Sequence, residues 1–356
     1  LRESCPEDVL ALDDVSFDVA EGELFCIVGP TNAGKSTLLK TVAGLHRPDG
    51  GRIAIAGADV TSLEPKDRQV SLLFQNIALF PTLTGYENIA FPLRTAGMGE
   101  AETRRRVAEV AAMLKIDHLL ERLPRTFSGG EQQRVAIGRA IAHRSRLLML
   151  DEPLTNLDAR IRIALRIEFK ALHRDTGQTM LYVPHDQVEA MSLSDRIAVL
   201  HEGRIQQIGT PDDIYARPAT RFVAEFVGMP PMNILGGELS ERDGAPAIVG
   251  NGFETAVDGL ERLAERGALP RRIGFGIRPE AMRVAPEPAP GAATPAEILW
   301  VERLGSRHVL DLRIGDAIVK ATVRPDHPVA AEGRAYVGFR PRAEHLLDPE
   351  TGRFYR

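Results

Sequence analysis

The stretch GPTNAGKS, residues 29 to 36, has the residue types and spacing of a loop that holds phosphate. It fits G-x-x-x-x-G-K-[ST] and follows an apolar run, Leu24 to Val28, which is the context the pattern requires. Glycines let backbone amides turn toward one anion, and the start of the following helix faces the same anion. Lys35 suits phosphate and Ser36 suits Mg2+, although a plain glycine turn after a buried strand is the alternative. The candidate binding residues are Gly29, Pro30, Thr31, Asn32, Ala33, Gly34, Lys35, Ser36 and Thr37.

Two adjacent acids follow a second apolar strand. Residues 147 to 152 read LLMLDE, so Asp151 and Glu152 lie where that strand ends. Asp151 is the candidate metal-side acid. An acid at the mouth of an apolar strand is partly desolvated and more basic, so Glu152 is the candidate general base toward an attacking water. The alternative is an ordinary solvated pair of acids at a strand end.

A second anion-binding position lies between the loop and the acids. Residues 127 to 140, FSGGEQQRVAIGRA, begin with a small hydroxyl residue and two glycines, Ser128, Gly129 and Gly130. The positions predicted to face a core in the helix that follows are Val135, Ile137 and Ile141. A helix that starts in this way is suited to bind an anion.

The elements that must position these residues change character along the chain. At 356 residues, two domains are expected. Helix and strand patterns alternate as far as residues 209 to 220, and a helix is predicted over residues 37 to 45. Short β-like runs follow, EILWVE, RHVLDLRI, DAIVKATV and AYVGFR. We therefore expect an α/β domain followed by a small all-β barrel or sandwich.

The composition argues against several classes of function. The net charge is −5, from 44 basic and 49 acidic residues, so no general positive field attracts nucleic acid or an anionic membrane. No apolar run approaches the ~20 residues that a spanning helix needs, and the first residues lack a signal-peptide pattern. A cytosolic protein is expected. Cys5 and Cys26 offer no disulfide framework, and Cys26 suits a small buried hydrophobe.

Six motifs now stand in a recognisable order: GPTNAGKST, LLFQN, FSGGEQQR, LLMLDEP, TNLD and VPHD. They resemble the Walker A loop, Q-loop, signature, Walker B strand, D-loop and switch histidine of an ATP-binding cassette (ABC) ATPase subunit. Residues 203 to 228 and the run GIRPE at residues 276 to 280 resemble carbohydrate importer subunits, which carry an OB-like, TOBE-type C-terminal regulatory domain.

The resemblance implies a P-loop NTPase fold, with a RecA-like core and a helical subdomain, over residues 1–218, and the helical insertion at about 76–125. The all-β OB-like domain would occupy residues 219–356. ATP and Mg2+ are the implied cofactors, and two copies would pack head to tail. The implied partners are two integral membrane permeases and, indirectly, a solute-binding protein, without nucleic acid. The subunit would lie on the cytoplasmic face of the membrane as a peripheral protein.

The same resemblance assigns roles to individual positions. Gln75 would approach the metal and the attacking water, so the implied metal residues are Ser36, Gln75 and Asp151. His185 would hold the γ phosphate and Glu152 in line, which makes Glu152, His185 and Gln75 the catalytic set. The other copy would supply the signature Ser128, Gly129, Gly130 and Glu131, and Asp158 would cross the dimer.

Residues 78 to 93, ALFPTLTGYENIAFPL, are unusually apolar for a loop. A docking groove for a permease helix, with Leu79 and Phe80 in contact, is one interpretation. The other is a core for the helical insertion itself. That core has support, because the following helix is predicted to place one face inward, with Val107, Val110, Ala111 and Leu114.

The chain departs from the family pattern at several positions. Residues 1 to 16 lack the aromatic that usually stacks on adenine, and Pro6 falls near its place. Phe17 is not a substitute, because Val15, Phe17 and Val19 alternate as the inward face of a predicted strand. Glu131 replaces the commoner Gln, and its carboxylate either repels phosphate or binds a ribose hydroxyl. Pro184, before His185, either stiffens the approach to that histidine or ends the strand.

Three functions were weighed. The leading hypothesis is an importer ATPase for a sugar or polyol, although polyamine, iron and oxyanion importers share this layout. A cassette ATPase acting on nucleic acid is disfavoured, because residues 297 to 356 carry ten basic and nine acidic residues and so lack a basic groove. A cassette without turnover is disfavoured by the intact Lys35, Asp151, Glu152 and His185.

Overall fold

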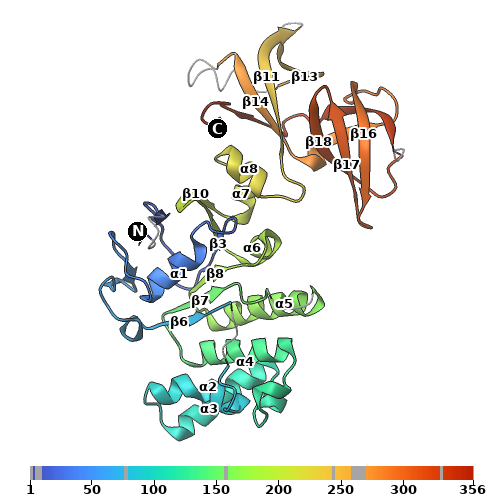
Figure 1. Cartoon of the computed structure of the whole chain (residues 1–356). Helices are drawn as coiled ribbons and strands as arrows, with labels where there is room; N and C mark the ends of the chain where they lie inside the picture. The colour runs from blue at the N-terminus through green and yellow to red at the C-terminus, as the bar shows by residue number, and fades with distance from the viewer. Residues whose placement is uncertain are drawn as a thin grey trace. The chain divides into compact units, whose positions relative to one another are not determined.

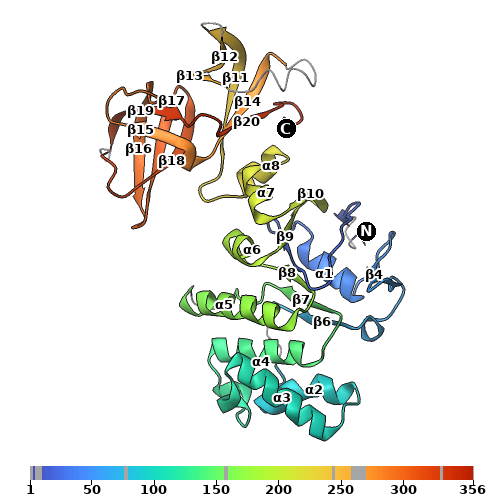
Figure 2. The same ribbon diagram turned by 180° about the vertical axis from the view of Figure 1, so that it is seen from behind.

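The computed structural model describes residues 3–4, 10–75, 79–155, 159–242, 245–257, 270–328 and 332–355. The chain divides into two compact units, Leu1–Asp213 and Ile214–Arg356 (Figures 1 and 2). Among the described residues, no helix combines the length and the apolar character that crossing a membrane requires.

A six-stranded sheet is the centre of the first unit, in the order β10-β9-β3-β8-β7-β6. All neighbours pair in parallel except β10 and β9. The carboxyl ends of parallel strands meet at one edge, so the loops after β3, β7 and β8 come together there. The strands are β3 (Leu24–Val28), β6 (Val70–Leu73), β7 (Leu147–Asp151), β8 (Met180–Val183), β9 (Arg196–His201) and β10 (Arg204–Gly209).

Helices cover both faces of this sheet. On one face α1 (Lys35–Ala43) packs Leu38 and Leu39 into a cluster with Phe25 and Ile27 of β3. On the other face lie α5 (Ala159–Thr176) and α6 (Gln187–Leu193), and the ring of Phe169 lies 6.1 Å from that of Tyr182. Cys26 is fully buried between these layers, and burial raises the pKa of its thiol, as expected for a packing residue.

A helical subdomain lies at one end of the first unit (Figure 1). It contains α2 (Gly85–Thr95), α3 (Glu100–Leu114) and α4 (Gly129–Ala142), with the short η2 (Asp117–Leu119) and η3 (Pro124–Thr126). Its core confirms the predicted helix faces. The buried residues include Val107, Val110, Ala111 and Leu114 of α3 and Val135, Ile137 and Ile141 of α4.

The start of the chain corrects one prediction. Val15 is buried, and the Phe17 ring stacks on Phe25 with centroids 5.2 Å apart, so the predicted inward face is confirmed. Residues 15 to 19 nevertheless form no strand. The alternation follows from packing on the core, which does not require the hydrogen bonds of a sheet. The other short elements are β1 (Glu3–Ser4), β2 (Leu10–Leu12), β4 (Ala54–Ile55), β5 (Ala58–Asp59) and η1 (Pro65–Asp67).

The second unit begins with two short helices, α7 (Pro211–Ala216), which starts just before the boundary, and α8 (Arg221–Phe226). Two five-stranded antiparallel sheets follow. One contains β11 (Asn233–Arg242), β12 (Ala245–Gly250), β13 (Phe253–Ala256), β14 (Arg272–Ile277) and β20 (Glu344–Leu347). The other contains β15 (Met282–Ala285), β16 (Thr294–Arg303), β17 (His308–Ile314), β18 (Ala317–Val323) and β19 (Gly333–Phe339), and η4 (Pro279–Ala281) precedes β15.

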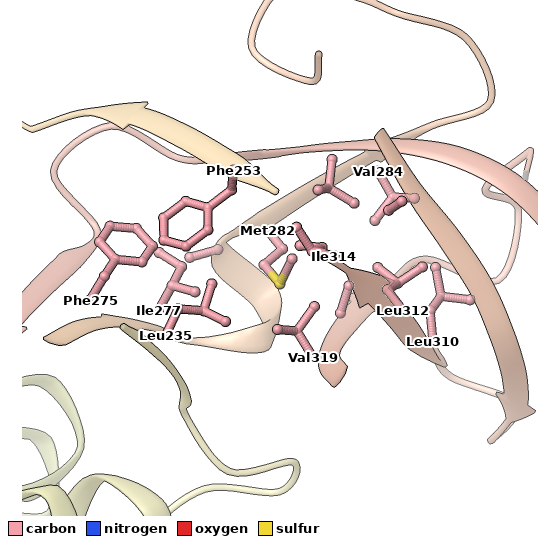
Figure 3. Close-up of a cluster of buried hydrophobic side chains, with 14 of the residues drawn as sticks. Leu235, Phe253, Phe275, Ile277, Met282, Val284, Leu310, Leu312, Ile314 and Val319 are labelled. Atoms are coloured by element: carbon pink, nitrogen blue, oxygen red, sulfur yellow. The ribbon is translucent and has the colours of Figure 1, made fainter. Parts of the chain in front are cut away.

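One apolar cluster joins the two sheets of this unit. Figure 3 shows Leu235 and Phe275 of the first sheet at one side of the cluster and Leu312 of the second sheet at the other, with Met282 and Val319, also of the second sheet, between them. The four predicted β runs correspond to β16, β17, β18 and β19. In the described part of the second unit, the elements after α7 and α8 are thus strands apart from the short η4, as the pattern indicated.

A buried arginine secures the two helices within this unit. Arg278 is 5% exposed, and its guanidinium lies 4.2 Å from the centre of the Tyr215 ring. It donates hydrogen bonds to the carbonyl oxygens of Ala224 and Val227 at the end of α8, and to that of Tyr215 in α7. One side chain therefore satisfies the open carbonyl ends of both helices.

Candidate nucleotide site

The loop between β3 and α1 is shaped by two close backbone approaches. Gly34 has φ of 100°, and a Cβ there would lie 2.5 Å from the carbonyl oxygen of Ala11. A Cβ on Gly29 would lie 2.1 Å from the carbonyl oxygen of Leu200. Only glycine fits either position. Because Gly34 caps α1 without a side chain, the first amides of that helix are left for a ligand.

The Lys35 ammonium lies within this loop. It donates hydrogen bonds of 2.8 Å to the carbonyl oxygens of Gly29 and Pro30. Burial lowers the pKa of Lys35, while the nearby carboxylates of Glu152 and Asp151 raise it. The loop thus combines a positive side chain with unpaired helix amides, which is the arrangement that binds polyphosphate.

Ser36 and Asp151 meet across the loop. The Ser36 hydroxyl donates to a carboxylate oxygen of Asp151 at 3.2 Å, and Asp151 is only 6% exposed. Burial raises the pKa of Asp151, and the Ser36 hydrogen bond opposes that effect. Among the described residues, no three acidic, histidine or cysteine side chains gather to hold a metal ion. A hydroxyl and one carboxylate fit Mg2+, which takes its remaining oxygens from phosphate and water.

Glu152 is held by three neighbours. Its Oε2 accepts hydrogen bonds from the Gln75 amide at 3.0 Å and from the Thr155 hydroxyl at 3.1 Å. The same oxygen lies 4.0 Å from Nδ1 of His185. The backbone of Glu152 has φ of 44°, a conformation that is uncommon outside glycine and is found at functional sites. The structure therefore brings the three candidate catalytic residues together, whereas Gln75 as a metal ligand stays a prediction.

A buried network beneath His185 was not foreseen from the sequence. The Tyr182 hydroxyl donates to Glu189, which is fully buried and also accepts a 3.4 Å hydrogen bond from the His185 amide. Arg166 donates to Asp186 at 2.8 Å and lies 3.9 Å from Glu189. Burial raises the pKa of Glu189. The available signal was the Asp186-x-x-Glu189 spacing, which is typical of a helix start.

Pro184 and Glu131, two positions where the chain departs from the family pattern, have different surroundings in the structure. The strand β8 ends at Val183, so Pro184 follows its last residue, where a missing amide costs no ladder hydrogen bond. Glu131 is turned back onto the start of its own helix. Its carboxylate accepts a 2.7 Å hydrogen bond from the Ser128 amide, and the Ser128 hydroxyl caps α4 in return.

The predicted signature does not meet the rest of the site within one chain. Ser128 and Gly129 are exposed, and Gly130 is buried against Ile161. Within the ranges that the structure describes, no hydrogen bond joins the start of α4, including Glu131, to the loop or to the acids. Asp158 lies outside the described residues. The trans roles of these residues therefore stay predictions.

An aromatic patch stands beside the helical subdomain. Phe80 is 38% exposed, its ring centre lies 4.7 Å from that of Phe91, and the guanidinium of Arg139 lies 5.3 Å from it. Phe91 is also exposed. We call Phe80, Phe91 and Arg139 the aromatic patch.

Comparison with protein families gives three matches. The model described as ABC transporter matches residues 12–155, the MalK OB fold domain matches residues 228–282, and the TOBE domain matches residues 275–347. The last two matches overlap at residues 275–282 and define two β modules, OB and TOBE, in the region where the sequence predicts an OB-like, TOBE-type domain; the bounds 219–356 stay a prediction.

Relatives match over nearly the whole chain. The sn-glycerol-3-phosphate import ATP-binding protein UgpC of Paraburkholderia xenovorans is 42% identical, over 96% of this chain and 94% of its own length. The trehalose/maltose import ATP-binding protein MalK of Thermococcus litoralis is 41% identical, over 97% and 95%.

A solved structure shares the first unit's fold. The ATP-binding cassette MJ0796, as a dimer in a post-hydrolysis state bound to ADP and Pi, is 30% identical with a TM-score of 0.53. The match covers 59% of this chain and 95% of that one. Together with the loop, the acids and the two β modules, these matches show that the chain belongs to the ATP-binding cassette transporter family, as an ATP-hydrolysing subunit of the importer type.

Proposed function

We propose that two copies of this chain close head to tail on ATP and drive solute import through two separate membrane permeases. The observation that carries the proposal is the set of contacts at Glu152. Its carboxylate is fixed by Gln75 and Thr155, faces His185, and stands directly after the Asp151 that contacts Ser36. A base, its positioning groups and a phosphate loop are what ATP hydrolysis needs.

Each residue then has a task. Lys35 and the first amides of α1 bind the β and γ phosphates, while Ser36 and Asp151 hold Mg2+, which neutralises charge on the phosphates when bound. Glu152 accepts a proton from the attacking water. Gln75 and His185 keep that water and the γ phosphate in line with the carboxylate oxygen.

The second copy supplies what one chain lacks. Ser128 and Gly129 at the start of α4 are exposed, and among the described residues this helix start makes no hydrogen bond to its own chain's phosphate loop. The capping box engages the amides of Ser128 and Glu131, which leaves those of Gly129 and Gly130 for an anion. We assign Ser128, Gly129, Gly130 and Glu131 to the partner's ATP, and Asp158 to the dimer interface. The relative MJ0796 is a dimer, which supports the same assembly here.

The solute is proposed from the relatives. The two relatives described above are import ATP-binding proteins for sn-glycerol-3-phosphate and for trehalose and maltose, at 42% and 41% identity. We therefore propose a sugar or a polyol phosphate. The permeases and an extracytoplasmic solute-binding protein would select it.

The aromatic patch is the proposed contact surface for the membrane partner. Exposed rings beside a guanidinium suit an apolar helix with a polar end. The subunit would then lie at the cytoplasmic face of the membrane as a peripheral protein. No role with nucleic acid is proposed.

Replacing the base tests the enzyme and the assembly together. In Glu152→Gln, ATP turnover should fall about 10²–10⁴-fold, because a positioned general base contributes that much. The variant should form a dimer only with ATP and Mg2+, measured by size-exclusion chromatography with light scattering. Glu102→Gln, at an exposed site on α3, is the matched control. Turnover at the parent rate in Glu152→Gln would refute the proposal, as would a monomer at saturating ATP.

A further inference from the structure

The signature helix of this chain carries a charge that the usual glutamine would not. Glu131 occupies the third position of α4, and its carboxylate accepts from the Ser128 amide at 2.7 Å. These contacts hold the pKa of Glu131 below its usual range, with the hydrogen bond from the Ser128 backbone as the main cause. The carboxylate is therefore ionised at neutral pH. It stands at the helix end that must attract a phosphate.

A histidine outside all six motifs contacts this carboxylate. Nε2 of His118, in η2, lies 3.3 Å from Oε1 of Glu131, and His118 is largely exposed. The other charged group that acts on Glu131 is Arg122, whose guanidinium lies 5.9 Å from the Phe127 ring and donates to the Thr126 carbonyl. His118 is the group that contacts Oε1, the far oxygen of this carboxylate, directly.

We propose that His118 is a positioning residue which offsets the Glu131 charge, so that the start of α4 can receive the γ phosphate of the partner's ATP. The inference rests on the head-to-tail dimer proposed above. A helix start carries about half a positive charge, and a carboxylate in the first turn offsets much of it. The His118 imidazole, in contact with the far oxygen of that carboxylate, draws its charge away from the helix start. His118 thus sets how tightly the dimer closes on ATP, without touching the nucleotide.

The geometry gives a clean set of variants. In Glu131→Gln the amide oxygen can still accept from the Ser128 amide, so the cap is kept and only the charge is lost. The ATP concentration at half-maximal turnover should fall about threefold, the size of a charge effect at a helix start. His118→Gln should raise it by a similar factor. His118→Lys should restore at least the parent value, because its ammonium can donate to the same Glu131 oxygen.

The decisive measurement is a double-mutant cycle on the full chain. Half-saturating ATP and maximal turnover are measured for the parent, the two glutamine variants and their combination, with melting temperatures as a check on folding. We expect His118→Gln to have no effect in the Glu131→Gln background and to leave maximal turnover unchanged. Additive effects, or equal effects of Lys and Gln at position 118, would overturn the inference.

A further variant separates this inference from the proposed dimer. Ser128→Arg places a bulky side chain at the exposed start of α4 and should abolish turnover if the partner's ATP binds there. If Ser128→Arg is inactive and the cycle is additive, His118 has no such role but the dimer stands. If Ser128→Arg turns over at the parent rate, the trans site itself is wrong.

Discussion

Gly34→Ala tests whether the phosphate loop depends on its approach to Ala11. An alanine at position 34 is destabilising for two reasons. Its backbone must keep φ of 100°, which costs about 1 kcal/mol for a residue with a Cβ, and its Cβ would lie 2.5 Å from a carbonyl oxygen. Overpacking of that kind costs about 1–3 kcal/mol, since the backbone on both sides must shift. We expect a total loss of about 3 kcal/mol in the free energy of unfolding.

Gly57→Ala is the matched control. Gly57 also has a positive φ, of 80°, but a Cβ there would meet nothing within 4 Å. Gly57→Ala should lose only the backbone contribution to the free energy of unfolding, about 1 kcal/mol. For a unit of this size, 1 kcal/mol corresponds to about 2–4 °C in melting temperature, so the two variants should differ by about 4–8 °C.

The assay is thermal unfolding followed by circular dichroism, with and without ATP. The unfolding transition whose melting temperature rises with ATP is assigned to the first unit, because a ligand stabilises the unit that binds it. Gly34→Ala should also bind ATP about tenfold or more weakly, in competition with a fluorescent analogue, since a shift of the loop misplaces its amides. The reasoning is refuted if Gly34→Ala has the same melting temperature as Gly57→Ala and binds ATP as tightly as the parent.

Two further predictions concern buried carboxylates. Burial raises the pKa of Asp151, so the folded state prefers the protonated carboxyl, and the stability that this preference gives at low pH is lost as the pH rises. Asp151→Asn should therefore raise the melting temperature of the ATP-free first unit at pH 7, and the increase should fade toward pH 4. Turnover of the same variant should fall about 10²-fold or more. An unchanged or lower melting temperature at pH 7 would contradict this. Glu189→Gln has a single carbonyl oxygen, so it can accept from the Tyr182 hydroxyl or from the His185 amide but not from both, and it removes the charge beside Arg166. Turnover should therefore fall about tenfold at unchanged half-saturating ATP. Parent turnover, or a loss of ATP affinity instead, would count against the network beneath His185.

Much of the site was predictable because its signals are local. The glycine and lysine spacing of the loop and the apolar strand before Asp151 and Glu152 are each written within a few residues. The inward face of α3 is likewise a matter of helical period. The burial predicted from such patterns agrees with the structure, because each element packs mainly by burying its apolar face.

The remainder depends on contacts between distant segments. No local pattern indicates that Gly29 meets the Leu200 carbonyl, or that Tyr182 and Arg166 converge on Glu189. The strand predicted at residues 15 to 19 failed for a related reason. Alternating burial fixes which side chains face inward, whereas a strand also needs a neighbour to pair with.

The Arg278 guanidinium has a consequence for the order in which the chain takes shape on the ribosome. Helices α7 and α8 have six residues each, and isolated helices shorter than about 12–15 residues are marginal in water. Arg278 follows the carbonyl groups it binds by 51 to 63 residues. At about 5–20 residues per second, it emerges roughly 3–12 s after them. The segment that leaves the ATPase unit therefore gains its full set of hydrogen bonds only when the first β module is nearly complete.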